Sequence, residues 1–303
     1  MRSRWLSPDR FFLVVILVPL LLLVAALIYY PAVSTFQTSL TNQNLRINRP
    51  IEQIGLENYS RLLGDDEFWE VLGRSLLVVA LILPMETIIA FAAALLLNEK
   101  FPGRGLVRSL AIIPWMVPPV VNGFLWGWLL NGEYGAFNGL LYQLGLIQDY
   151  QYWLREPSTQ IIWVAIVHTW TRFAFPMIVL LAGLQGIPPD LYDAAKVDGA
   201  GGLQRMVRIT IPMLLPSLAV SLVVEFISAF QIFDVVWTLT AGGSAGGAIN
   251  PFTKTLMIYN YELVFRDLRI GLGAALSYLI LLMSLGVGFF FIRRLYNQGV
   301  KSR

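Results

Sequence analysis

The chain has 303 residues, of which 56% are hydrophobic and only 14% are charged, and its formal net charge is +3. A soluble globule of this length would need more polar side chains to cover its surface, so the composition indicates an integral membrane protein. The lack of cysteine excludes disulfides and thiolate chemistry, and a single histidine leaves little for metal binding.

Several apolar stretches have about the 20 residues that cross a ~30 Å hydrocarbon core as a helix. We expect spans at about residues 11–30, 75–97, 109–130, 161–184, 213–233 and 270–292. The first span follows the basic sequence MRSR, but it is too long for a signal peptide and no small-residue cleavage site follows it. No stretch shows the alternation of a β-barrel strand. The predicted fold is therefore an all-α integral membrane protein with six transmembrane helices in a single domain, residues 1–303.

Lysine and arginine residues predict the orientation of these spans. If the amino terminus is cytoplasmic, the inside segments carry more Lys and Arg than the outside loops, which are longer and richer in carboxylates. Both termini are therefore expected in the cytoplasm. The polar loop at residues 186–212, between the fourth and fifth spans, is then also cytoplasmic.

This loop contains the sequence PPDLYDAAKVDGA, residues 188–200. The two prolines and Asp190 are typical of a helix start, and the glycine at 199 is typical of a helix end. Alanines at 194 and 195 leave room for another protein surface to approach closely. Spacing alone is equally compatible with an amphipathic linker that lies on the lipid headgroups.

The segment YDAAKVDGA resembles the EAA loop of membrane subunits of binding-protein-dependent ATP-binding-cassette (ABC) importers. Asp193 stands where that family usually has glutamate, which keeps the charge and shortens the side chain by one methylene group. The segments IPWMVPPVVNGFLWGWLLNGEYGAFNGLL and FDVVWTLTAGG are similar to maltose-type and glycerol-phosphate-type permeases, so the resemblance covers nearly the whole chain. It implies the ABC type I importer permease fold.

In such permeases the EAA loop forms a helix that docks on a cytoplasmic ATPase. The resemblance therefore implies a coupling role for Asp193, Ala194, Ala195, Lys196, Asp198 and Gly199. It also implies four kinds of partner: a second homologous permease subunit, two copies of a cytoplasmic ABC ATPase, an extracytoplasmic solute-binding protein and the lipid bilayer. Nucleic acid has no expected role. The chain contains no GxxxxGK[ST] motif, so we expect no ATPase site and no bound cofactor here, with ATP and Mg held by the ATPase subunits.

Three ionisable residues, Glu86, Arg172 and Glu225, fall near the middle of predicted spans. Charges at that depth are costly and face a cavity or one another. A buried ion pair of Arg172 with either glutamate is one interpretation, and a polar route for substrate is the other.

Helical spacing predicts that Glu225, Ser228 and Ile232 share one face, with Gln231 beside it, and that His168 shares a face with Arg172. Trp170 or Phe230 could supply an aromatic platform for a hydroxyl-rich ligand, whereas His168 is more typical of an interhelical hydrogen bond. Asn122 follows the Pro118-Pro119 break, where freed carbonyl groups could face the cavity or the helix could simply kink. The expected substrate-pathway residues are Glu225, Ser228, Gln231, Ile232, Arg172, Glu86 and Asn122.

The resulting prediction is the transmembrane subunit of an ATP-driven importer in the cell membrane, forming half of the pathway for a sugar or related polyhydroxy solute. An ion-coupled secondary transporter is an alternative favoured by the mid-membrane charges, although the sequence has no apparent internal repeat. A second alternative is an intramembrane serine protease, because residues 242–246 read GGSAG and match GxSxG. That reaction would need His168 within reach of Ser244.

Overall fold

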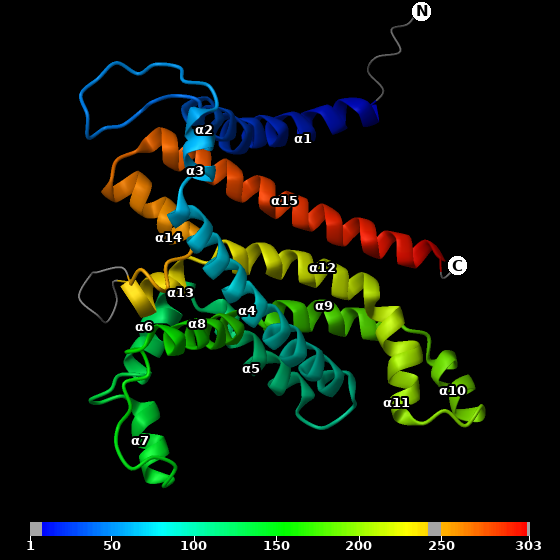
Figure 1. The fold of residues 1–303 in the computed structure, drawn as a ribbon. Helices are drawn as coiled ribbons and strands as arrows, with labels where there is room; N and C mark the ends of the chain where they lie inside the picture. Colours follow the sequence, from blue (N-terminus) through cyan, green and yellow to red (C-terminus); the bar gives the residue numbers. More distant parts are fainter. Residues whose placement is uncertain (1–7, 242–249, 302–303) are drawn as a thin grey trace, which may run out of the picture. The chain divides into compact units, whose positions relative to one another are not determined.

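The structure is a computed structural model that describes residues 8–241 and 250–301. Within this part the regular elements are helices, and Thr41 and Gln53 form an isolated antiparallel bridge (Figure 1). The chain divides into two compact units. Unit 1 comprises the described residues up to 65 together with 260–279, and unit 2 comprises the described residues of 66–259 and 280–303.

Unit 1 begins with a long apolar helix. This helix is built from α1 (Pro8–Val24), the π-helical segment η1 (Ala25–Tyr29) and α2 (Tyr30–Ser39), which follow one another directly. The candidate span runs from Phe12 to Ser39, and no residue of its most apolar window is buried within the chain. Its side chains are therefore available to lipid or to another protein.

The rest of unit 1 consists of α3 (Glu57–Leu63), the π-helical segment η4 (Glu262–Arg266) and the first residues of α15 (Ile270–Lys301). The buried amide of Asn58 donates hydrogen bonds to the carbonyl oxygens of Ser39 and Thr41, both at 2.8 Å. A Cβ atom at Gly271 would lie 2.3 Å from the Thr41 oxygen, so only glycine permits this approach of α15. These contacts fix the segment that follows the first span.

Unit 2 contains the remaining helices. They are α4 (Asp66–Asn98), α5 (Arg104–Met116), α6 (Pro119–Leu129), α7 (Ala136–Gln143), α8 (Pro157–Arg172), α9 (Ala174–Gln185), α10 (Pro189–Val197), α11 (Gly202–Arg205), η2 (Met206–Thr210), α12 (Ile211–Phe230), α13 (Asp234–Val236), η3 (Trp237–Ala241), the part of α14 (Leu256–Tyr261) up to Tyr259 and the remainder of α15. Figure 1 shows α7 and α10 at opposite ends of this unit. This separation agrees with the prediction that their loops lie on opposite sides of a membrane.

The core of unit 2 forms where α4 packs against α8, α9 and α12. Buried residues of α4 recur every three or four positions, as expected for a helix with one buried face. Ala90 and Ala94 are fully buried in a cluster with Met177 and Leu180 of α9 and Leu214 of α12. Their small side chains allow the helices to approach closely.

Two of the predicted spans are broken. The span expected at 109–130 consists of α5 and α6, which meet at 96°, and the span expected at 161–184 consists of α8 and α9, which meet at 49°. Prolines explain the first break, because Pro118 and Pro119 remove amide donors and push the preceding Val117 into an extended conformation.

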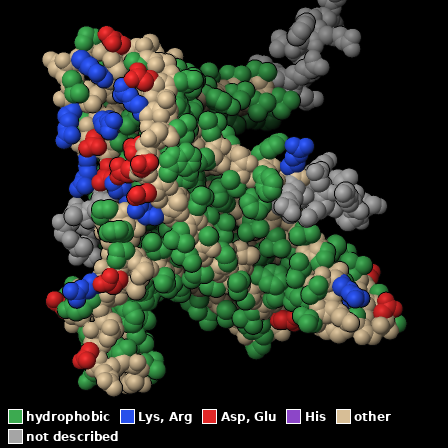
Figure 2. Space-filling view, in the orientation of Figure 1, with side chains coloured by type: hydrophobic (Ala, Val, Ile, Leu, Met, Phe, Trp, Pro, Cys, Tyr) green, Lys and Arg blue, Asp and Glu red, His purple; other side chains and the backbone are tan. Residues whose placement is uncertain are grey.

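The described residues contain four unbroken helices that are long and apolar enough to cross a membrane, or six spans if each bent pair crosses once. Hydrophobic side chains cover much of the visible surface, as expected for helices in contact with lipid (Figure 2). The helices extend beyond the predicted limits, since the first reaches Ser39 and α4 begins at Asp66. Polar first and last turns explain the difference, because the hydrocarbon core limits only the apolar part of a helix.

Candidate functional site

The helix α10 occupies the middle of the predicted coupling loop. It begins with a proline at its first position and ends in a Schellman motif. In that motif the Gly199 amide donates to the Lys196 oxygen at 3.0 Å, and the Ala200 amide donates to the Ala195 oxygen at 2.8 Å. Gly199 has a φ of 77°, which glycine adopts without steric cost. Both ends of this short helix are thus defined by local sequence.

Short and charged side chains form the exposed side of α10. The Lys196 ammonium group donates a 2.8 Å hydrogen bond to the Asp193 carboxylate, one turn away. This bond lowers the pKa of the Asp193 carboxyl group below its usual value. Ala194 and Asp198 are exposed and Ala195 is half-buried. The structure therefore gathers all six predicted coupling residues on one helix and its C-terminal turn.

A contact that the sequence did not reveal joins α10 to the core of unit 2. The hydroxyl groups of Tyr192 and Thr210 are 3.0 Å apart and form a hydrogen bond. Tyr192 and Ile209 also pack against the cluster that contains Ile187 and Leu214. Partly buried packing and a hydrogen bond therefore both hold Tyr192 against this core.

The helix that follows α10 is continuous into the membrane. From α11 through η2 to α12 the residues Gly202–Phe230 form 29 consecutive helical residues. Large apolar side chains are exposed around α10, with Val197 exposed by 88% and Leu203 by 78%. Exposed apolar side chains grouped with charges mark a site of contact with another protein or with a membrane surface.

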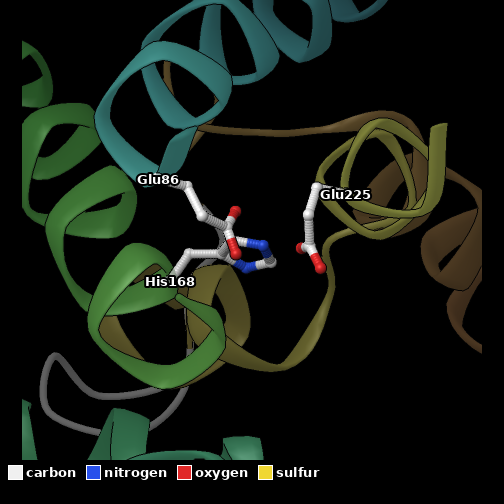
Figure 3. Close-up of side chains that lie close together, drawn as sticks. All are labelled: Glu86, His168 and Glu225. Carbon is white, nitrogen blue, oxygen red and sulfur yellow. The ribbon is translucent and has the colours of Figure 1, made fainter. Parts of the chain in front are cut away.

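A polar cluster lies inside unit 2, where three helices meet. Glu86 of α4, His168 of α8 and Glu225 of α12 are 1%, 5% and 2% exposed. One carboxylate oxygen of each glutamate and one ring nitrogen of His168 all lie within 4.8 Å of one another. Figure 3 shows the Glu86 side chain beside the His168 ring and Glu225 approaching from the opposite helix.

Arg172, one turn after His168, forms the ion pair that the sequence left open. Its Nε atom is 3.5 Å from the Glu225 carboxylate, and its side chain is 27% exposed whereas that of Glu225 is 3% exposed. Glu86 makes no ion pair among the described residues, and its carboxyl group interacts with that of Glu225. The partner of Arg172 is therefore Glu225.

A cavity of about 240 Å³ opens next to this cluster. Among the predicted pathway residues, Arg172, Ser228, Gln231 and Ile232 line it. The other lining residues are Pro119, His168, Thr171, Phe233, Asp234 and Val235. Hydroxyl, amide, imidazole and carboxylate groups thus share one small space, a composition suited to a hydroxyl-rich solute.

Three of the predicted pathway residues do not line the cavity. Glu86 and Glu225 lie in the buried cluster behind His168 and Arg172. Asn122 is buried at the break between α5 and α6, where its amide donates to the carbonyl oxygens of Pro114 and Val117 at 3.1 and 3.2 Å. These bonds satisfy carbonyls that the bend would otherwise leave free, so Asn122 stabilises the bend.

The predicted helical face of α12 was partly wrong. Because α12 ends at Phe230, Gln231 is its C-cap residue and Ile232 lies beyond it. Ile232 therefore reaches the cavity from irregular backbone rather than from a shared helical face. Gln231 donates a hydrogen bond to Ser284 of α15 at 3.4 Å, which orients its amide.

The aromatic group at the cavity also differs from the prediction. Phe233 lines the cavity and stacks on Trp237 at 5.7 Å. Trp170 instead contacts Trp126, and Phe230 stacks on Phe226 at 5.5 Å within α12. Phe233 was missed because it follows the end of the helix, where helical spacing carries no information.

The protease alternative cannot be placed in the structure, because Ser244 and the rest of the GGSAG sequence lie outside the described residues. His168, its predicted base, is buried beside two glutamates in the cluster.

Comparison with known proteins identifies the family and supports the helix arrangement. Residues 86–302 match the family described as "Binding-protein-dependent transport system inner membrane component". The sulfoquinovosyl glycerol transport system permease protein SmoG of Agrobacterium fabrum is 33% identical over 292 residues, which cover 96% of this chain and 92% of SmoG. The trehalose/maltose transport system permease protein MalF of Thermococcus litoralis is 37% identical over 264 residues, covering 87% of this chain and 86% of MalF.

Solved structures share the fold. A chain in the crystal structure of a bacterial ABC transporter that imports the acidic polysaccharide alginate matches with a TM-score of 0.78, at 23% identity and over 96% of both chains. The predicted all-α, multi-pass fold of an ABC type I importer permease is therefore confirmed. This chain belongs to the family of binding-protein-dependent transport system inner membrane components.

Proposed function

We propose that this chain forms half of the translocation pathway of an ABC importer for a sugar or related polyhydroxy solute, and that α10 couples the pathway to a separate ATPase. Family membership identifies the chain as a permease subunit. The observation that carries the coupling role is the anchoring of α10, since the Tyr192–Thr210 hydrogen bond joins an exposed docking helix to the transmembrane core.

Coupling requires α10 to move as a rigid body with the helices behind it. When two ATPase subunits close on ATP, a helix lodged in their surface is displaced. The Schellman motif at Gly199 keeps α10 from unwinding, and Tyr192 transmits the displacement to α4, α9 and α12. Ala194 allows close seating, while the Asp193–Lys196 pair supplies charge at the rim.

In this proposal ATP and Mg are bound by the partner ATPase. The sequence contains no P-loop motif, so this chain acts without a nucleotide site or catalytic residues of its own. The complete transporter would contain a second permease subunit, two ATPase copies and a solute-binding protein on the outside. A crystal structure of the alginate ABC transporter in complex with its alginate-bound periplasmic protein supports an arrangement of this kind.

The cavity beside Arg172 is the proposed part of the pathway. Ser228, Gln231 and Asp234 offer hydrogen-bonding groups, and Phe233 offers an apolar ring face. The names of the relatives, which refer to trehalose, maltose and sulfoquinovosyl glycerol, support a glycoside as the cargo. Sugars need both kinds of contact, because their hydroxyl groups are polar and their ring faces are apolar.

The assembled transporter in lipid vesicles tests this proposal. A panel of disaccharides, oligosaccharides and polyols is added with the binding protein, and ATP hydrolysis and uptake are measured together. We expect one class of glycoside to stimulate both, and inactivation of the ATPase to abolish uptake. Uptake that continues with an inactive ATPase but follows an ion gradient would instead support the secondary-transporter alternative.

A further inference from the structure

The buried cluster of Glu86, His168 and Glu225 has no part in the coupling described above, and of its members His168 alone lines the cavity. Its members come from α4, α8 and α12, so it lies where the central helices of unit 2 meet. All three side chains are more than nine-tenths buried, and they point toward one another (Figure 3). A role for this cluster would therefore be additional to the proposed function.

Several buried polar atoms of this cluster are left unsatisfied within the described chain. Arg172 is the cation next to it, and its Nε atom is 3.5 Å from Glu225. The Nε2 atom of His168 is buried and makes no hydrogen bond to any described residue, and the buried carboxyl group of Glu86 interacts with that of Glu225. Buried carboxyl groups that face one another are stabilised by a cation or by a proton between them.

We propose that Glu86, His168 and Glu225 bind one divalent transition-metal ion of the Zn²⁺ class. One imidazole and two carboxylates form a ligand set that zinc uses in proteins. The imidazole favours Zn²⁺ over Mg²⁺ and Ca²⁺, which take oxygen ligands. An ion at this position links three helices that otherwise meet through unsatisfied polar atoms.

The spacing of the ligand atoms is suitable after a small adjustment. Bonds of about 2.0–2.2 Å in a tetrahedral site place ligand atoms about 3.4 Å apart. The three atoms here lie within 4.8 Å of one another, so closure needs a shift of roughly 1 Å. Glutamate side chains can make such a shift by rotation about their flexible bonds.

Arg172 and the cavity complete the site. Arg172 contacts one carboxylate oxygen of Glu225 and leaves the other free, which is the arrangement of an outer partner that orients a metal ligand. His168 also lines the cavity, so an ion has a polar route to the cluster. Because the Arg172 side chain is 27% exposed, its charge stays partly hydrated next to the ion.

The chain is well suited to a direct binding test because it contains one histidine and no cysteine. The full chain is purified without a histidine tag, placed in lipid nanodiscs, treated with chelator and exposed to Zn²⁺ or Co²⁺. Bound metal is counted after desalting, and the Co²⁺ absorption spectrum reports its coordination. We expect one ion per chain and a spectrum typical of low coordination number.

Two variants locate the ion, and a third provides the control. Glu86→Gln and His168→Gln should each weaken binding at least tenfold, whereas Glu70→Gln, which changes an exposed carboxylate of the same helix, should leave it unchanged. Helix content measured in parallel ensures that the compared proteins are folded, and the two ligand variants serve as independent tests. Less than half an ion per wild-type chain, or equal binding by the wild type and both ligand variants, would overturn the proposal. A shared proton in place of a metal would give the first of these results.

Discussion

The helix α10 and the buried cluster each contain an ion pair, but the surroundings of the two pairs differ. Asp193 and Lys196 are 2.8 Å apart, with side chains 67% and 58% exposed. Arg172 and Glu225 are 3.5 Å apart, and the Glu225 side chain is only 3% exposed. Water screens the first pair, so its loss costs folding little, whereas loss of one partner of the second leaves a buried charge. The first pair is therefore available for docking and the second is a structural constraint.

The largest effect is expected from Arg172→Met. The substitution leaves the Glu225 carboxylate buried without its cation, which typically costs about 3–5 kcal/mol. Denaturant unfolding of the purified chain in detergent should show this loss. The double variant Arg172→Met/Glu225→Leu should recover most of it, because the pair is then replaced by apolar side chains. A single variant as stable as the wild type would mean that the pair does not constrain the fold.

Gly199→Pro should have the next largest effect, and on coupling rather than on folding. Proline fixes φ near −65° and has no amide hydrogen, so it fits neither the φ of 77° nor the bond to Lys196. The backbone strain that proline introduces at the end of α10 should amount to about 1–3 kcal/mol. We expect this strain to lower transport at least tenfold while ATP hydrolysis continues. Uptake and hydrolysis are measured on the same vesicles.

The chain offers a matched control for this change. Gly145, after α7, has a φ of 69° and closes a Schellman motif with the same two hydrogen bonds. Gly145→Pro should strain its helix end equally but leave the ratio of uptake to hydrolysis unchanged. If both prolines uncouple transport alike, the effect comes from general strain and α10 has no special role.

The sequence predicted α10 better than the buried cluster, because interactions between residues close in sequence can be inferred from it and contacts between separate helices cannot. Prolines and Gly199 act within one turn, so the ends of α10 could be read directly. The end of α12 at Phe230 has no such signal, and helical spacing therefore placed Ile232 wrongly. The hydrogen bond between Tyr192 and Thr210 depends on how separate helices pack, and helical periodicity does not encode that packing. The same is true of the ion pair that Arg172 forms with Glu225.

Ala195→Trp tests the docking surface itself. The indole would occupy space on α10 that the ATPase needs for docking. Substitution at an important interface position typically weakens the free energy of binding by about 2 kcal/mol. This corresponds to roughly 30-fold weaker binding of the ATPase. Ala136→Trp on the exposed side of α7 is the control. Co-purification of the ATPase at increasing salt measures the difference, and equal retention by both variants would argue against docking at α10.

Tyr192→Phe should have a smaller effect, because it removes only the hydrogen bond to Thr210 and keeps the packed ring. The net contribution of such a bond is about 1 kcal/mol. Hydrogen exchange of the α10 amides should become several-fold faster, with overall stability nearly unchanged. Unaltered exchange would mean that ring packing alone anchors α10.

The smallest effect on stability is expected from Asp193→Asn, at the opposite extreme from Arg172. The pKa of Asp193 is lowered by the hydrogen bond from Lys196, so the carboxyl group stays ionised at neutral pH. Any stability from the pair is present above the usual aspartate pKa of 3.8 and is lost as the pH falls through the lower folded-state value. At neutral pH the variant should unfold like the wild type, because water already solvates both charges.

Salt should weaken ATPase binding less in the Asp193→Asn variant than in the wild type, since one charged contact is gone. Identical salt dependence would place the Asp193 charge outside the interface and limit docking to the alanines and the exposed apolar side chains.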